Sequence, residues 1–164
     1  MKAGEMIIGS APFASDWATE MAIISSPDGE ARAVIRQRRN DGTEGRGIVL
    51  TLRELKNLVA AYFEWDEEGG CLGKVPVKGG SGLPKLNILQ KIAVLGKTED
   101  EWSREFNIVS FNERAPRFDI REWLPDHKKS RNGKMLSERE MEMIAGAYEQ
   151  HFGPLPHRKE HWWE

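Results

Sequence analysis

The sequence predicts an α+β protein built from two tandem β-β-β-β-α units. Three observations predict this fold: an internal repeat, strand-like alternation of polar and apolar residues in each copy, and a helix-start pattern at the end of each copy. The two copies span residues 1–65 and 85–152. Residues 66–84 are rich in glycine and proline and are expected to form a flexible linker, and residues 153–164 form a C-terminal tail.

The repeat emerges when residues 16–25 are aligned with residues 101–110, an offset of 85 that becomes 86 after one inserted residue. Collinear identities with a single slip indicate duplication of one structural unit. Each copy alone is small for a stable core, so we expect the two to pair within the chain as a pseudo-dimer. The identical pairs are Trp17/Trp102, Glu20/Glu105, Ile23/Ile108, Ser25/Ser110, Arg32/Arg117, Ile35/Ile120 and Arg36/Arg121 at the first offset, and Gly47/Gly133, Leu50/Leu136, Arg53/Arg139, Glu54/Glu140, Ala61/Ala147 and Tyr62/Tyr148 at the second.

In the first copy, strands are expected at residues 6–9, 17–25, 32–38 and 47–50. A helix is expected to begin after Thr51, because Glu54 three residues later completes a capping box. Consecutive strands with short connections favour an antiparallel sheet. The apolar face of the helix is predicted to comprise Leu55, Leu58, Val59 and Tyr62.

The second copy repeats this order, with strands expected at residues 86–95, 102–111, 118–123 and 134–136. Ser137 and Glu140 form the second capping box, and Gly153 and Pro154 are expected to end the helix near Phe152. Its apolar face is predicted to comprise Met141, Ile144, Ala145 and Tyr148.

The formal net charge of −2 argues against a simple basic nucleic-acid binder, but it conceals local differences. Residues 32–46 contain five basic and two acidic residues, and residues 104–134 contain eight basic and five acidic ones, so each segment carries +3. The second helix holds four glutamates against one arginine. The strands and their loops are therefore basic, whereas this helix is acidic.

Strand periodicity places these charges on one face of each sheet. Phe118 and Ile120 share the face expected to meet the helix, which leaves Arg121 and Trp123 on the opposite face with Asp119. In the first copy this opposite face carries Val34, Arg36 and Arg38. A face that mixes arginine with aromatic rings suits single-stranded nucleic acid, whose phosphates bind cations and whose bases stack on rings. The alternative is an ordinary solvated face with a tryptophan half-buried at a dimer seam.

The string Phe118-Asp119-Ile120-Arg121-Glu122-Trp123, followed by Pro125-Asp126-His127, residues 133–136 and a Ser-capped helix, resembles the positive cofactor four family, in particular its small bacterial and phage members. The resemblance covers residues 85–152 and extends more weakly, through the repeat, over residues 6–65. It implies a strongly curved four-stranded sheet backed by a helix, paired units, and binding of single-stranded or unwound DNA with little sequence preference. It also implies a role in transcription, replication or repair, without catalysis.

By match to the family pattern, the expected DNA contacts are Arg121, Trp123, Arg131 and Lys134, then Trp102 and Arg104, and by sign and position Arg117. The basic loop and the first copy add Lys128, Lys129, Trp17, Arg32, Arg36, Arg38, Arg39 and Arg46. The first copy departs from the pattern, because Val34, Gln37 and Arg38 stand where the second has Asp119, Glu122 and Trp123.

Other functions remain as alternatives. The same fold could recruit a protein through its acidic helix, or bind single-stranded RNA instead of DNA. The expected partners are single-stranded nucleic acid and transcription or replication proteins, the expected state is a monomeric pseudo-dimer or a homodimer, and the expected location is the cytoplasm or the nucleoid.

We expect no enzyme, cofactor, metal site or membrane partner. The single cysteine, Cys71, lies in the linker and excludes a thiolate zinc site, and no apolar run approaches the roughly 20 residues of a membrane span. His157 and His161 are spaced i, i+4, but they lie in a polar tail. Trp162 and Trp163 in the same tail could cap a core, stack on bases or remain free.

Overall fold

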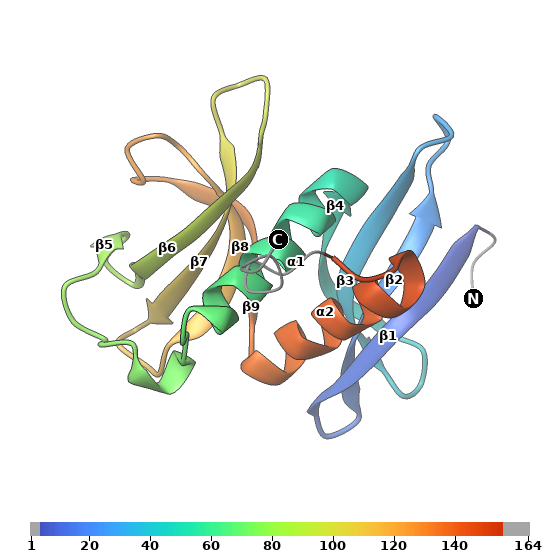
Figure 1. The fold of residues 1–164 in the computed structure, drawn as a ribbon, viewed down its shortest axis with the longest axis horizontal. Coiled ribbons are helices and arrows are strands. Elements are labelled where there is room, and N and C mark those ends of the chain that lie inside the picture. Colours follow the sequence, from blue (N-terminus) through green and yellow to red (C-terminus); the bar gives the residue numbers. More distant parts are fainter. Residues whose placement is uncertain (1–3, 156–164) are drawn as a thin grey trace, which may run out of the picture.

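The computed structural model describes residues 4–155 and shows two consecutive antiparallel sheets, each followed by a helix (Figure 1). The first sheet has the order β1-β2-β3-β4 and the second the order β5-β6-β7-β8-β9. The predicted α+β fold class and the order of elements are thus confirmed. The first unit comprises β1 (Glu5–Ala14), β2 (Trp17–Ser25), β3 (Ala31–Arg39), β4 (Glu44–Thr51) and α1 (Leu52–Glu67); the second comprises β5 (Ser81–Gly82), β6 (Leu86–Lys97), β7 (Ser103–Phe111), β8 (Arg117–Trp123), β9 (Ser130–Leu136) and α2 (Glu138–Phe152).

The segment expected to be a flexible linker contains regular structure. Helix α1 continues to Glu67, a 3₁₀ helix, η1, spans Leu72–Lys74, and β5 adds a fifth strand at the outer edge of β6. Leu72 is buried in the main core, and Ser81 and Gly82 pair with Ile88 and Asn87. The linker is therefore packed against the folded units at two places, through Leu72 and through β5. The sequence did not predict β5, because two small residues carry no alternation.

Both helices begin at the predicted capping boxes. The Thr51 hydroxyl accepts a hydrogen bond from the Glu54 backbone N–H at 3.0 Å, and the Glu54 carboxylate accepts one from the Thr51 backbone N–H at 2.9 Å. Ser137 and Glu140 repeat this arrangement at 3.1 and 2.8 Å. Each box satisfies backbone donors that the first helical turn leaves unpaired.

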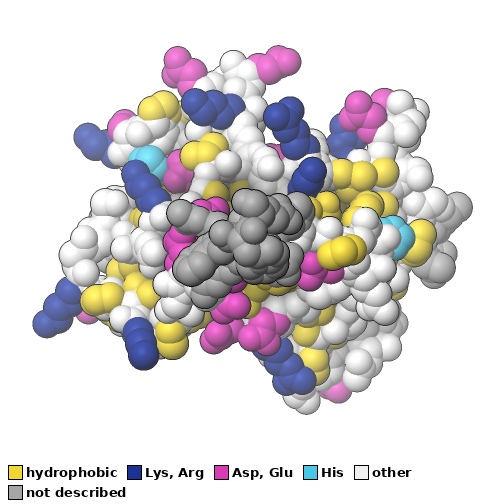
Figure 2. All heavy atoms as spheres, in the orientation of Figure 1, with side chains coloured by type: hydrophobic (Ala, Val, Ile, Leu, Met, Phe, Trp, Pro, Cys, Tyr) yellow, Lys and Arg dark blue, Asp and Glu magenta, His cyan; other side chains and the backbone are white. Residues whose placement is uncertain are grey.

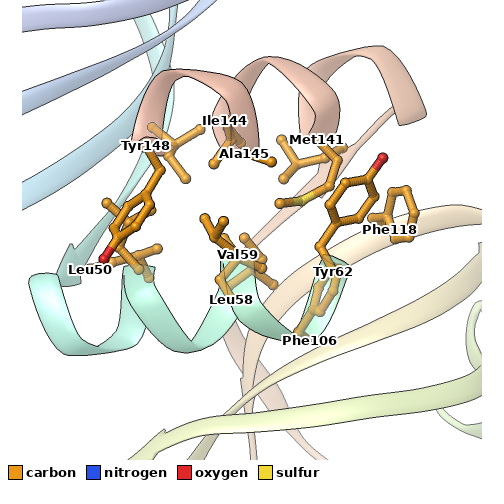
Figure 3. Packing of buried hydrophobic residues seen from close by; sticks show 14 of the residues in the cluster. Leu50, Leu58, Val59, Tyr62, Phe106, Phe118, Met141, Ile144, Ala145 and Tyr148 are labelled. Atoms are coloured by element: carbon orange, nitrogen blue, oxygen red, sulfur yellow. The ribbon is translucent and has the colours of Figure 1, made fainter. Parts of the chain in front are cut away.

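The helices pack across the boundary between the units. Helix α1 lies against β6 of the second sheet, α2 lies against β1 of the first, and the helices also contact each other (Figures 1 and 3). The Asn57 side chain on α1 donates to the Leu95 backbone oxygen on β6 at 3.0 Å. On the other side, a Cβ added at Gly9 on β1 would lie 2.7 Å from Cβ of Ala147 on α2, so only glycine permits this approach.

Equivalent repeat positions make contacts in both directions across the boundary. Glu54 at the start of α1 pairs with Arg104 of the second sheet at 3.3 Å, and Glu140 at the start of α2 accepts a hydrogen bond from Thr19 of the first sheet. Residues 19 and 104 differ by the first repeat offset, and residues 54 and 140 differ by the second. Reciprocal contacts of this kind are what two-fold-related packing requires, so the chain forms an intrachain pseudo-dimer.

One main core joins the two units. Leu58, Val59 and Tyr62 of α1 face Met141, Ile144 and Ala145 of α2, with Phe106 and Phe118 of the second sheet beside them (Figure 3). All eight residues predicted for the two helical apolar faces are buried. A smaller cluster lies on the other face of the second sheet and contains Leu86, Ile88, Val109 and Trp123.

Candidate nucleic-acid interface

The predicted site lies on the sheet faces that point away from the helices. In the second sheet this face brings together Arg121 and Trp123 of β8, as predicted, and Glu105 and Asn107 of β7, which were not among the predicted contacts. Arg121 is held against Asp119, with its Nε 3.1 Å from the nearer carboxylate oxygen. Its guanidinium lies over Gly133, at a position where any Cβ would collide with it.

Acidic groups on this face offset the cation. The Asp119 side chain is fully buried, and burial raises its pKa to about 6, while Arg121 acts in the opposite direction. Glu105 contacts the His127 ring nitrogen Nε2 at 2.9 Å and accepts a hydrogen bond from the Asn107 amide at 3.1 Å. The Arg121 charge on this face is therefore offset by nearby carboxylates, and the face is not an open cationic surface.

Trp123 corrects the expectation of an exposed stacking ring. The indole is on the predicted face but is completely buried, packed among Leu86, Ile88 and Val109, with Leu83 partly buried beside it. In this conformation the ring has no surface on which a base could stack.

On the corresponding face of the first sheet, the arginine charges are also neutralised by carboxylates. Arg36 is buried and lies between Glu5 and Glu20, with its Nε 2.9 Å from Glu20. Arg38 contacts Glu20 at 2.7 Å and Glu44 at 3.3 Å. Two guanidinium groups therefore meet three carboxylates, which contradicts the expectation that this face is basic.

Other predicted contacts are engaged within the protein. Arg104 donates to the Val49 backbone oxygen at 2.6 Å and lies 3.7 Å from Glu122. Arg117 lies 3.6 Å from the buried Glu140. Lys134 is buried, and burial lowers its pKa, with Glu140 opposing this shift.

Arg32 is held at the β2–β3 turn by Asp28 at 3.4 Å and Glu30 at 3.6 Å. Its guanidinium also donates a hydrogen bond to the Ser26 hydroxyl. Arg32 therefore stabilises the β2–β3 turn, and the two carboxylates partly neutralise its charge.

Two tryptophan–arginine pairs remain accessible at the surface. Trp102 is half-buried, and the Arg131 guanidinium lies over its ring at 4.2 Å from the centroid. Arg131 also contacts Glu122 at 3.1 Å and Asp100 at 3.3 Å. Trp17, at the same repeat position in the first copy, is half-buried with Arg39 at 5.6 Å. These distances lie within the range for cation–π attraction. The arginine comes from β9 in one copy and from β3 in the other.

Four predicted cations are exposed: Arg39, Arg46, Lys128 and Lys129. Arg46 also lines a hollow of about 450 Å³ at the seam where β4 of the first sheet approaches β9 of the second, together with Val49, Arg104 and Asn132. On the face seen in Figure 2, Lys and Arg side chains are spread around the edge and lie among Asp and Glu. Among the predicted contacts, the exposed positive charge therefore lies at strand ends, in loops and at this seam.

The acidic surface of α2 is smaller than its composition suggests. Glu138 and Glu142 are exposed, but Glu140 is buried in the capping box and in its contacts with Thr19 and Arg117. The acidic residues that matter to the predicted interface, namely Glu20 and Glu105, could have been found from the sequence. They are identical in the repeat and stand directly opposite Arg36 and Arg121 in the strand registers.

No match to the sequence was found among protein-family models or among curated proteins. Within residues 4–155, no group of three or more His, Cys, Asp or Glu side chains is arranged to hold a metal ion. In the same part of the chain, no helix combines the length and apolar character needed to cross a membrane. His157, His161, Trp162 and Trp163 lie outside the described residues.

Proposed function

We propose that this protein binds single-stranded nucleic acid with little sequence preference and without catalysis. The observation that carries the proposal is the pair of Trp–Arg contacts, Trp17–Arg39 and Trp102–Arg131, because each copy has an arginine guanidinium beside a half-buried ring. Ring stacking tolerates any base, and neighbouring cations follow the backbone. Lys128 and Lys129, in the loop before β9, add exposed charge to the end of the second sheet that holds Trp102 and Arg131.

The fold supports this proposal independently. A four-stranded and a five-stranded antiparallel sheet, each followed by a helix and paired as a pseudo-dimer, agree in outline with the architecture implied by the resemblance to the positive cofactor four family, to which β5 is an addition. Under the proposal, single-stranded DNA is the main ligand, and the protein acts in transcription, replication or repair alongside proteins of those processes. Because the arginines on the sheet faces are paired with carboxylates, we expect the first contacts with nucleic acid at the Trp–Arg pairs.

The test is an anisotropy titration of labelled oligo-dT at about 50 and about 200 mM salt. We expect binding that weakens steeply with salt, because phosphate contacts release counterions. Absence of binding at both concentrations would refute the proposal. A matched RNA oligonucleotide in the same titration determines which nucleic acid is preferred.

Substitutions in the Trp102–Arg131 pair test whether this pair forms part of the binding site. Trp102→Ala should lower the affinity about five- to tenfold, as expected for loss of one stacked base, and Arg131→Ala should also reduce the salt dependence. Arg139→Ala is the matched control, because Arg139 is an exposed arginine on α2, outside both pairs. Equal losses in all three variants would indicate a nonspecific charge effect and contradict the assignment.

A further inference from the structure

The short strand β5 covers Trp123. A Cβ added at Gly82 would lie 3.4 Å from Cη2 of the Trp123 indole, and the partly buried Leu83 packs against the same cluster. Gly82 and Leu83 thus reach the cluster on the face of the second sheet that points away from the helices, while Ser81 and Gly82 pair with the edge of β6. Gly82 and Leu83 cover part of the indole, which is also contacted by the His127 ring, at 5.6 Å between centroids, and lies in the cluster against which Met135 packs.

This segment is held by few bonds. It forms two residue pairs with β6, Ser81 with Ile88 and Gly82 with Asn87, and a tight turn in which Leu83 and Leu86 exchange backbone hydrogen bonds at 3.0 and 3.2 Å. Gly79 and Gly82 have positive φ angles of 80° and 107°. A short, glycine-rich edge strand of this kind is expected to open more readily than the core strands.

Two buried polar atoms on the covered face have no hydrogen-bond partner: Nε1 of Trp123, which is a donor, and Oδ1 of Asn107, which is an acceptor. Buried polar atoms are nearly always paired, so an orphaned donor and acceptor on one face require an explanation. A nucleobase offers edges with both acceptors and donors, together with a flat ring that can stack on indole. Arg121, on the same strand as Trp123, adds a guanidinium to this face.

The cover belongs to one unit only. Arg38 stands at the repeat position of Trp123 in the first copy, and within the described residues no strand pairs with the outer edge of β1. The extra strand therefore occurs where the tryptophan occurs.

We propose that residues 79–83 form a displaceable strap over a second base-stacking site at Trp123, so that the strap limits the affinity of the second unit for single-stranded nucleic acid. This inference rests on the proposed function and assigns its regulation to the linker. Binding at the exposed Trp–Arg pairs does not require the strap to move, whereas stacking on Trp123 does.

The test compares strap-weakening variants with the intact protein. Leu83→Asn removes an apolar contact with the Trp123 cluster, and Gly82→Val introduces a β-branched residue where φ is positive. Val77→Asn is the matched control, because Val77 lies in the same linker but outside that cluster. Amide hydrogen exchange over residues 81–89 reports opening of the strap, and anisotropy with oligo-dT reports affinity.

We expect Leu83→Asn or Gly82→Val to accelerate exchange and to raise the affinity for oligo-dT at least about fivefold, whereas Val77→Asn changes neither. Adding Trp123→Leu, which keeps an apolar side chain but removes the ring, should abolish the gain. A gain that survives this second substitution would overturn the proposal.

The remaining outcomes separate the strap from the proposed function. If the intact protein binds and an opened strap leaves the affinity unchanged, the strap proposal fails and the proposed function stands. If neither the intact protein nor an opened variant binds, both fail. If neither variant accelerates exchange, the segment is fixed and the strap proposal is overturned, whatever the intact protein binds. Binding only by an opened variant supports the strap.

Discussion

A duplicated glutamate–arginine pair has different partners in the two copies. Glu20 stands opposite Arg36 and binds it at 2.9 Å, whereas Glu105 stands opposite Arg121 but contacts His127 instead. The reason lies at one position, because Val34 in the first copy is replaced by Asp119 in the second. Asp119 gives Arg121 a carboxylate partner on the same strand, so Glu105 pairs with His127.

Asp119 predicts a specific pH dependence of stability. Its pKa is raised from 3.8 to about 6 in the folded protein, mainly by burial, so between these values the folded state holds more protons than the unfolded state. Stability contributed by this group is therefore present at low pH and is lost as the pH rises from about 4 through about 6. The loss amounts to about 3 kcal/mol, since one pKa unit corresponds to about 1.4 kcal/mol.

The measurement is urea unfolding of the wild type and Asp119→Asn at about pH 4 and about pH 7. The asparagine variant lacks the ionisation, so its stability relative to the wild type should increase toward pH 7. Because other groups titrate alike in both proteins, the difference between them isolates Asp119. A difference that does not change with pH would contradict the assignment.

At the level of elements, both helices depend on their capping boxes. Ser137→Ala should lower the free energy of unfolding by about 1 kcal/mol, because it leaves the Glu140 backbone N–H without its side-chain acceptor. Thr51→Ala should have a similar effect at α1. Urea denaturation checks both, and Ser137→Thr, which keeps a hydroxyl acceptor, is the control. If alanine and threonine were equally stable at position 137, the box would contribute nothing.

In strand β8, the alternation of side chains predicts the face on which each residue lies but not whether it is buried. The alternation of Phe118 and Ile120 with Arg121 and Trp123 correctly predicted which side chains meet the helices. It did not predict that Trp123 would be buried on the other face, because its cover comes from β5, a segment about 40 residues earlier in the chain.

At the scale of the whole molecule, each helix packs against the sheet of the other unit, and this packing predicts that neither unit folds as a monomer on its own. In a fragment of residues 1–76, α1 would lose β6, and the first sheet would lose α2. The same holds in reverse for a fragment of residues 77–164. We expect each fragment alone to lack a cooperative unfolding transition as a monomer, and an equimolar mixture to recover one.

Unfolding curves combined with light scattering check this expectation. The intact chain should elute as a monomer of 18.7 kDa, because the second unit already occupies the place of a partner. A fragment that unfolds cooperatively as a monomer would show that the packing of each helix against the other unit's sheet is not needed for folding. A stable dimer of the intact chain built on helix-to-strand contacts between chains would contradict the intrachain pairing.

The order of elements, both helix starts and the buried helix faces followed from the sequence, because each depends on neighbours within a few residues. Thr51 and Glu54 lie three apart, and the apolar residues of α1 recur at helical spacing. The duplication itself was also visible, since the matched positions stand in the chain. Local chemistry and periodicity therefore determined both α-helices, the strands other than β5, their order and the number of units.

Tertiary structure alone decided which charges remain accessible. Arg36 and Arg104 look alike as basic strand residues, yet one is buried between carboxylates and the other is tied to a backbone oxygen and a helix start in the partner unit. Charge compensation and burial depend on distances between segments far apart in sequence, and composition does not contain those distances. The sequence by itself determined a duplicated α+β chain with basic strands. The folded arrangement determined that, of the predicted contacts, those that stay exposed lie at strand ends, in loops and at the seam, and that Trp123 is buried.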